Sequence, residues 1–99
     1  MDLQLQNKKA LITGSTAGIG LAIAKRLARE GATVIVNGRS QSSVDDAVAD
    51  IQKETENKNV SGIAADFSKK EEIENIFDTI EEIDILINNV GIFNEVPFE

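Results

Sequence analysis

A glycine-rich turn between a strand pattern and a helix pattern constrains the fold of this chain more than any other feature. The turn covers residues 13–20 (TGSTAGIG) and follows a short apolar run of strand length at residues 8–12. Beyond the turn, apolar residues recur at the four-residue spacing of a packed helix. Such a turn presents unpaired backbone N–H groups at the positive end of a helix dipole, and this geometry attracts phosphate.

Strand and helix patterns alternate along the rest of the chain, which indicates a parallel sheet with helical crossovers. The expected strands cover residues 9–13, 33–37, 60–65 and 84–88. Three helices are expected between them: residues 18–30, a second helix capped by Ser40 or Ser42, and a third that begins with a capping box at residues 68–71. Right-handed crossovers then place the strands of this βαβαβαβ chain in the order 3-2-1-4.

Apolar spacing also predicts which helix faces are buried. The inner face of the second helix is expected to consist of Val44, Ala47, Val48 and Ile51. The inner face of the third helix is expected to consist of Ile73, Ile76, Phe77 and Ile80. Gly31 is the expected stop of the first helix, because glycine readily takes the left-handed conformation that ends helices. Gly62 weakens the pattern of the third strand.

Composition excludes several classes of function. A chain of 99 residues forms one small domain, and its net charge of −7 without a basic cluster argues against nucleic-acid and anionic-membrane partners. The absence of cysteine and histidine removes disulfides and the thiolate and imidazole metal ligands. No run approaches the roughly 20 apolar residues of a membrane span, and the first residues lack a signal-peptide pattern. A cytoplasmic location is therefore expected.

The spacing of the glycines resembles the T-G-x-x-x-G-x-G cofactor motif of the short-chain dehydrogenases/reductases. A glycine triple alone would equally suit a tight turn that binds nothing. The resemblance implies an α/β fold with a partial, Rossmann-like, doubly wound parallel sheet, in which residues 1–99 form a single, truncated dinucleotide-binding domain. The residues of the motif that it assigns to the cofactor site are Gly14, Ser15, Thr16, Gly18, Ile19 and Gly20.

The end of the second strand bears on which nicotinamide cofactor is preferred. A carboxylate there would accept from a free ribose 2′-hydroxyl, but residues 36–40 (VNGRS) contain none. Arg39 instead offers a guanidinium suited to a phosphate monoester, and Asn37, Ser15 and Ser40 could add neutral donors. This pattern resembles the branch of the family that prefers NADP over NAD. The alternative is that Arg39 is a solvated surface cation.

Two further segments match the family. Asp66 resembles the acidic residue that contacts the adenine amino group, although it would equally suit the start of a turn before a helix. Phe67 beside it is interpreted as core or pocket wall. Asn89, Val90 and Gly91 belong to a segment that resembles the N-N-A-G signature, with valine where alanine is usual. Its paired asparagines can bridge neighbouring strand ends through hydrogen bonds to the backbone.

The catalytic residues of the family are not found in this chain. Family members carry a serine and a Tyr-x-x-x-Lys pair further on, whereas this sequence has no tyrosine, and its last serine and lysine are Ser68 and Lys70. The leading hypothesis is the NADP(H)-binding N-terminal portion of an oxidoreductase that transfers hydride between nicotinamide and a carbonyl or alcohol, truncated and inactive by itself. The alternatives are a non-catalytic dinucleotide-binding or assembly module, and a scaffold remnant that binds nothing.

Truncation would also leave sheet surface open. The fourth strand, with Ile85, Leu86 and Ile87, would form an apolar edge, and the sheet face away from the first two helices would be thinly covered. We therefore expect a homo-oligomer that forms through the fourth strand or the uncovered face.

Overall fold

Strands and helices alternate in the computed structural model, which describes residues 7–66, 69–72, 74 and 83–89. The elements are β1 Lys9–Ile12, α1 Gly18–Arg29, β2 Thr33–Gly38, α2 Gln41–Thr55, β3 Val60–Ala64 and β4 Ile85–Ile87. Residues 70–72 and 74 are also helical, at the place expected for the third helix. Each strand boundary lies within one residue of its predicted position, because short β-branched runs bounded by turns mark strands clearly.

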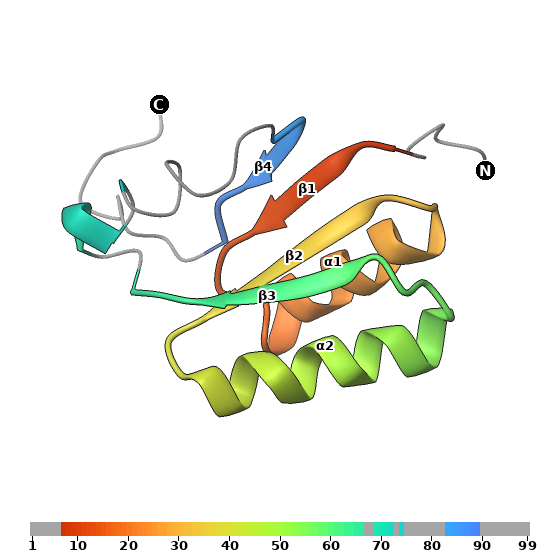
Figure 1. Cartoon of the computed structure of the whole chain (residues 1–99), viewed down its shortest axis with the longest axis horizontal. Coiled ribbons are helices and arrows are strands. Elements are labelled where there is room, and N and C mark those ends of the chain that lie inside the picture. The colour runs from red at the N-terminus through yellow and green to blue at the C-terminus, as the bar shows by residue number, and fades with distance from the viewer. Residues whose placement is uncertain (1–6, 67–68, 73, 75–82, 90–99) are drawn as a thin grey trace.

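The four strands form one parallel sheet in the order β3-β2-β1-β4 (Figure 1). In the register, Ala10 of β1 lies between Val34 of β2 and Ile85 of β4, and Val34 pairs in turn with Val60 of β3. This order confirms the predicted α/β, Rossmann-like topology. Because β1 lies inside the sheet, its carboxyl end is bordered by the ends of both β2 and β4.

Helices α1 and α2 cover one face of the sheet (Figure 1). Alternate strand residues face them, and the resulting core consists of Ala10, Ile12, Ala24, Ala28, Ala32, Val34, Val36, Ala47, Ile51 and Val60. The predicted inner face of α2 is confirmed, since Val44, Ala47 and Ile51 are buried and Val48 is partly buried against the core. Alanine on α1 lets that helix approach the sheet closely.

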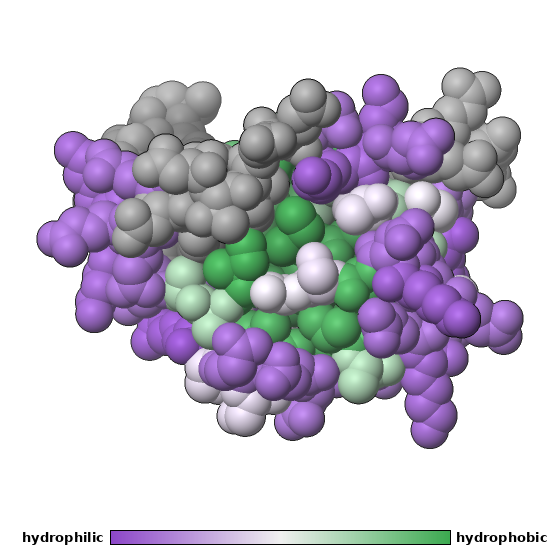
Figure 2. All heavy atoms as spheres, in the orientation of Figure 1, coloured by the Kyte–Doolittle hydropathy of each residue, from purple (hydrophilic) through white to green (hydrophobic). Residues whose placement is uncertain are grey.

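The opposite face of the sheet is also apolar. Leu11 and Ile35 point to it and are 0% and 6% exposed, whereas Leu86 of the edge strand β4 is 50% exposed. Figure 2 shows hydrophobic residues gathered in the middle of the molecule's visible face, with hydrophilic residues around them. The residues expected to pack here from the third helix (Ile73, Ile76, Phe77 and Ile80), and Ser68 of its capping box, lie outside the described residues.

The carboxyl-terminal end of α1 is closed by the expected glycine. Gly31 has φ 93°, and its N–H donates to Ala28 O at 3.1 Å. The next N–H, of Ala32, donates to Leu27 O at 3.1 Å. These two bonds form a Schellman motif, which satisfies carbonyls that have no partner within the helix.

Ser40, rather than the alternative Ser42, is the N-cap of helix α2, since the Ser40 side chain accepts from the Ser43 N–H at 3.2 Å. The helix lies directly over β3 at Gly62. A Cβ added to Gly62 would overlap Cγ1 of Val44. The glycine that weakened the strand pattern is therefore the place where α2 contacts the sheet.

Candidate functional site

The amino-terminal end of α1 lacks a side-chain cap. Its N-cap residue, Ala17, is extended and offers no side-chain hydrogen bond, and no acidic residue lies in the first turn. The first bond within the helix runs from Leu21 N–H to Ala17 O at 3.3 Å. The N–H groups of residues 18–20 therefore have no acceptor within α1, and the helix dipole makes this end attractive to an anion.

Two glycines shape the amino-terminal end of α1 in different ways. Gly18 has φ +62°, a conformation that other residues rarely adopt, and a Cβ there would meet nothing within 4 Å. A Cβ on Gly20 would instead lie 2.5 Å from Gly14 O and 2.7 Å from Asn89 Nδ2. Gly20 thus allows the turn and the end of β4 to pack against the helix, while Gly18 leaves open space in front of it. Ile19 between them is 73% exposed.

The side chains of Ser15 and Asn37 hold the glycine-rich turn in place through hydrogen bonds. Ser15 Oγ donates to Ile12 O at 2.7 Å and accepts from the Asn37 N–H at 2.9 Å. Asn37 Oδ1 accepts from the Gly14 N–H at 3.0 Å. Its Nδ2 donates at 3.2 Å to two carbonyls near the end of β3, those of Ile63 and Ala65. Both side chains were expected to add donors to a bound phosphate, but here they are at most 1% exposed and their donors bind the protein itself.

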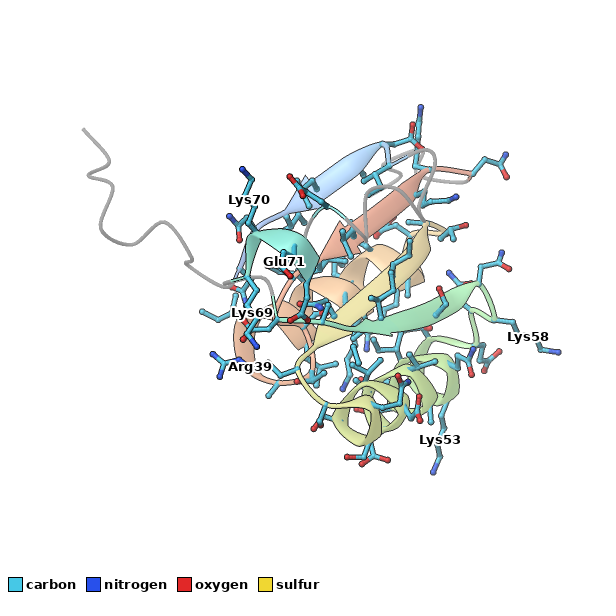
Figure 3. The ribbon with its side chains drawn as sticks, turned by 60° about the vertical axis from the view of Figure 1, so that its left-hand side comes forward. Arg39, Lys53, Lys58, Lys69, Lys70 and Glu71 are labelled. Carbon is cyan, nitrogen blue, oxygen red and sulfur yellow. The ribbon has the colours of Figure 1, made fainter. Side chains whose placement is uncertain are left out.

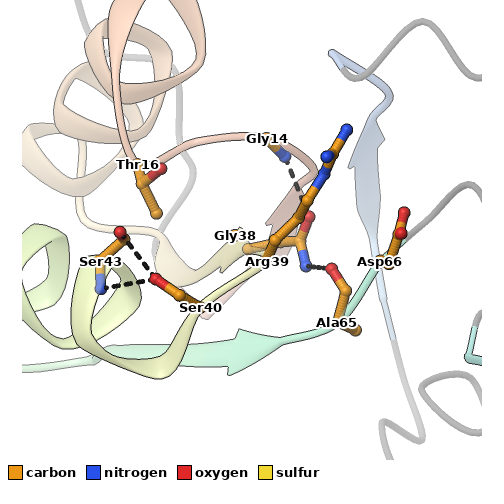
Figure 4. Close-up of a pocket in the computed structure, with 9 residues that line it drawn as sticks. Gly14, Thr16, Gly38, Arg39, Ser40, Ser43, Ala65 and Asp66 are labelled. Atoms are coloured by element: carbon orange, nitrogen blue, oxygen red, sulfur yellow. Dashed lines mark hydrogen bonds between the residues drawn. The ribbon is translucent and has the colours of Figure 1, made fainter.

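A pocket of about 390 Å³ opens beside this turn, between the starts of α1 and α2 (Figure 4). Its lining residues are Gly14, Thr16, Asn37, Gly38, Arg39, Ser40, Ser43, Ala65 and Asp66. Six of these were predicted site residues, and the pocket brings them together from three loops. Sequence reasoning missed Gly38, Ala65 and Ser43. Only Ser43 carried a signal, because a residue three positions after an N-cap lies on the first turn of its helix.

Arg39 is the cation at the rim of the pocket. It is exposed and forms no ion pair with another residue in the described part of the chain. Figure 4 shows its side chain and that of Asp66 extending the same way from neighbouring strand ends. Figure 3 shows Lys69 and Lys70 on the same side of the molecule as Arg39, with Lys53 and Lys58 away from it. The guanidinium is thus available to an anion in the pocket.

Asp66 begins a turn, which is one of the two interpretations left open by the sequence, and it also lines the pocket. Its carbonyl accepts from the Lys69 N–H at 3.0 Å, and its N–H donates to Glu72 Oε1 at 2.7 Å. The backbone of Asp66 therefore starts a turn before a helical segment, while its side chain lies at the pocket (Figure 4).

The expected bridge between strand ends is present at Asn89. Its Nδ2 donates to Gly14 O at 3.1 Å, and its N–H donates to Thr13 Oγ1 at 2.8 Å. These bonds join the end of β4 to the glycine-rich turn. Phe67, Val90 and Gly91, the other predicted site residues in these two segments, lie outside the described residues.

The described residues contain neither a cluster of metal ligands nor a membrane-spanning helix. No group of three or more histidine, cysteine, aspartate or glutamate side chains there could hold a metal ion. No helix in that part of the chain is long and apolar enough to cross a membrane.

Comparisons with known proteins agree with the topology of the sheet and with the geometry of this site. Residues 8–99 match the family model described as short chain dehydrogenase. The Bacillus subtilis protein described as uncharacterized oxidoreductase YvrD is 48% identical over 101 residues, which cover 99% of this chain and 37% of that protein. Mouse dehydrogenase/reductase SDR family member 4 is 46% identical, over 89% of this chain and 32% of that protein.

A solved structure gives the same result. L-Sorbose reductase from Gluconobacter frateurii, in complex with NADPH and L-sorbose, has a TM-score of 0.79 and 34% identity, over 92% of this chain and 36% of that one. The chain belongs to the short-chain dehydrogenase/reductase family, whose members bind nicotinamide dinucleotides. It spans about a third of the length of the relatives that it matches.

Proposed function

We propose that residues 1–99 are the NADP(H)-binding N-terminal portion of a short-chain oxidoreductase that transfers hydride between nicotinamide and a carbonyl or alcohol. One observation carries the proposal: the uncapped start of α1 adjoins a pocket that contains Arg39 and no carboxylate from β2. Unpaired helix N–H groups bind a pyrophosphate, and a guanidinium at the end of β2 binds a ribose 2′-phosphate.

The described residues fit such a cofactor. The open space before Gly18 gives a pyrophosphate access to the backbone, and the close packing at Gly20 holds the turn in place. Arg39 is assigned to the 2′-phosphate, Ser40 to the part of the pocket that surrounds this phosphate, and Asp66 to the adenine amino group. The remaining proposed contacts are Gly14, Thr16 and Ile19 near the pyrophosphate, Asn89, Val90 and Gly91 near the ribose, and Phe67 in the pocket wall.

The proposed reaction divides the work between cofactor and protein. The bound nicotinamide supplies hydride transfer, and the residues of this chain bind and orient the adenosine-phosphate half. The NADPH complex of L-sorbose reductase supports the choice of cofactor. Since the chain contains no tyrosine, the family's proton-transferring Tyr-x-x-x-Lys pair is not among its residues. We therefore propose binding without turnover by these residues alone, which is also what a non-catalytic binding module would show.

Titration by calorimetry with NADP⁺ and NAD⁺ tests this proposal. We expect tighter binding of NADP⁺, and about a tenfold loss of NADP⁺ affinity in Arg39→Ala with NAD⁺ affinity unchanged, because one charge-assisted contact is lost. Arg26→Ala is the matched control, since Arg26 is exposed, lies outside the pocket and, among the described residues, forms an ion pair only with Glu30. Equal affinity for the two cofactors in the unmodified chain would refute the NADP preference.

The edge strand supports a second, structural proposal, that the chain forms a homo-oligomer. Strand β4 ends the described sheet, and Leu86 on it is half exposed. An apolar, unpaired strand edge favours pairing with a second copy. Leu86→Lys is expected to shift the sedimentation coefficient to that of a monomer. A monomer for the unmodified chain at tens of micromolar would contradict this proposal.

A further inference from the structure

Ser43 lies in the pocket, although the resemblance to the family did not assign it to the site. It belongs to the first turn of α2, three residues after the N-cap Ser40. Ser40 Oγ accepts from the Ser43 backbone N–H at 3.2 Å and donates to Ser43 Oγ at 2.8 Å. Figure 4 shows both bonds at the edge of the pocket, across from Thr16.

The hydrogen bond between the two serine hydroxyls runs from Ser40 to Ser43. Ser40 uses its acceptor to cap α2 and its proton to reach Ser43 Oγ. The Ser43 oxygen accepts that bond, so its own proton is directed elsewhere. A hydroxyl that already accepts a hydrogen bond is a stronger donor, because successive bonds polarise one another. The pair thus presents one reinforced donor, on Ser43, to an anion in the pocket.

Ser43 and Arg39 line one pocket, whose wall includes a glycine. Gly38 lies in the pocket wall, and a Cβ there would meet Thr16 Cγ2 at 2.5 Å. Gly38 therefore lets Thr16 approach the end of β2 closely, and the hydroxyl of Ser43 and the guanidinium of Arg39 border the same pocket. Two donors around one point suit a phosphate monoester, which has three acceptor oxygens.

We propose that Ser43 determines specificity in this pocket: its hydroxyl, oriented by Ser40, donates to the 2′-phosphate of an adenosine nucleotide. The inference rests on the proposed function, and it assigns the choice between the phosphorylated and free ribose to α2 as well as to Arg39. Ser40 acts through Ser43 and is a positioning residue.

Two nucleotides that differ only in the 2′-phosphate isolate this contact: adenosine 2′,5′-bisphosphate and adenosine 5′-monophosphate. In Ser43→Ala, we expect affinity for the bisphosphate to fall about three- to tenfold, with affinity for the monophosphate unchanged. The helix cap survives this change, because Ser43 contributes its backbone N–H to the cap. Ser42→Ala, on the same exposed turn but outside the pocket, is the matched control.

Ser43→Asp separates a ligand effect from a folding effect. A carboxylate in the first turn of a helix stabilises the helix, whereas it repels a phosphate in the pocket. We expect this variant to unfold no more easily than the unmodified chain and to prefer the monophosphate.

The outcomes distinguish the two levels of the proposal. If the unmodified chain prefers the bisphosphate but Ser43→Ala and Ser43→Asp keep that preference in full, the assignment of Ser43 is wrong and the NADP proposal stands. If the unmodified chain binds the two nucleotides equally or binds neither, both proposals fail.

Discussion

The two ends of α1 show how one helix can serve both the fold and a ligand. At its carboxyl-terminal end, carbonyls are satisfied by the Schellman bonds at Gly31 and by Asn57, whose Nδ2 donates to Ala28 O at 2.9 Å and to Ala32 O at 2.8 Å. At its amino-terminal end, Ala17 supplies no side-chain cap. Within the described residues, the protein satisfies the carboxyl-terminal end of the helix internally, whereas the amino-terminal end lacks a side-chain cap and is the proposed site of the pyrophosphate.

Two asparagines, one near each end of α1, allow the two ends to be compared further. Asn37 near the uncapped end and Asn57 near the closed end both donate two Nδ2 bonds to carbonyls and accept one at Oδ1, from Gly14 and Asn59 respectively. They differ in surroundings, since Asn37 is 1% exposed and Asn57 is half-buried. The two asparagines form the same number of hydrogen bonds but differ in burial. Replacing them is therefore expected to lower the free energy of unfolding by different amounts.

The largest effect is expected for Asn37→Ala. Removing this amide, from a residue that is only 1% exposed, leaves the Gly14 N–H and the Ile63 and Ala65 carbonyls without this partner. We expect the free energy of unfolding, measured by urea denaturation, to fall by about 4 kcal/mol. Cofactor affinity should fall as well, because the glycine-rich turn loses its support. A variant that unfolds earlier but binds NADP⁺ as before would show that the turn holds its shape without Asn37.

Asn57→Ala is expected to have an intermediate effect. The carbonyls of Ala28 and Ala32 lose a donor, but water can reach this end, so the free energy of unfolding should fall by about 2 kcal/mol. Cofactor affinity, corrected for the folded fraction, should not change. Asn59→Ala is the control, because Asn59 is exposed and its side chain forms no hydrogen bond with the described residues. An equal loss in the two variants would remove the assigned role of Asn57.

The smallest effect concerns Lys25, which joins the two helices between these ends. Hydrogen bonds to Glu54 and Asp50 raise the pKa of Lys25 above its usual value of 10.5. A pKa raised by folding stabilises the folded chain below pH 10.5, and this contribution disappears as the pH rises through the folded-state pKa. Exposed ion pairs contribute little, so the effect is small.

The pH dependence is measured against a variant without the amine. The difference in free energy of unfolding between the unmodified chain and Lys25→Met should favour the unmodified chain at pH 7 and vanish above the raised pKa. Lys53→Met, which removes a lysine without an ion pair to any described residue, controls for the loss of one charge. A difference that stays constant between pH 7 and the alkaline range would contradict the assigned pairing.

The sheet could be predicted from the sequence because each of its signals is local. Strand bounds follow from short apolar runs, the order of strands follows from crossover handedness, and Gly31 marks the end of α1 through its own conformational freedom. The start of α2 remained open between Ser40 and Ser42, because either side chain can cap a helix.

The roles of the site residues were harder to predict, because a sequence shows which groups can donate but not what they face. Ser15 and Asn37 have suitable donors, but both side chains bind strand-end carbonyls that only the folded sheet brings near. Ser43 reaches the pocket because α2 begins at Gln41, and a start two residues later would turn it elsewhere. The sequence therefore predicts the position of the candidate site better than the role of each side chain in it.

Val44 has a consequence for how this pocket can diversify. A Cβ at Gly62 would overlap Cγ1 of Val44, and a Cβ at Gly38 on the adjacent strand would lie 3.2 Å from its Cγ2. These contacts of Val44, one residue after Ser43, fix the distance of α2 from the sheet and its rotation about its own axis. Val44 packs α2 against the sheet, and the adjacent Ser43 is the proposed contact to the nucleotide. Because the two side chains face opposite ways, residue 43 can be substituted while α2 keeps its position. On the proposed assignment of Ser43, nucleotide preference is a property that single substitutions can redirect without a change in the fold.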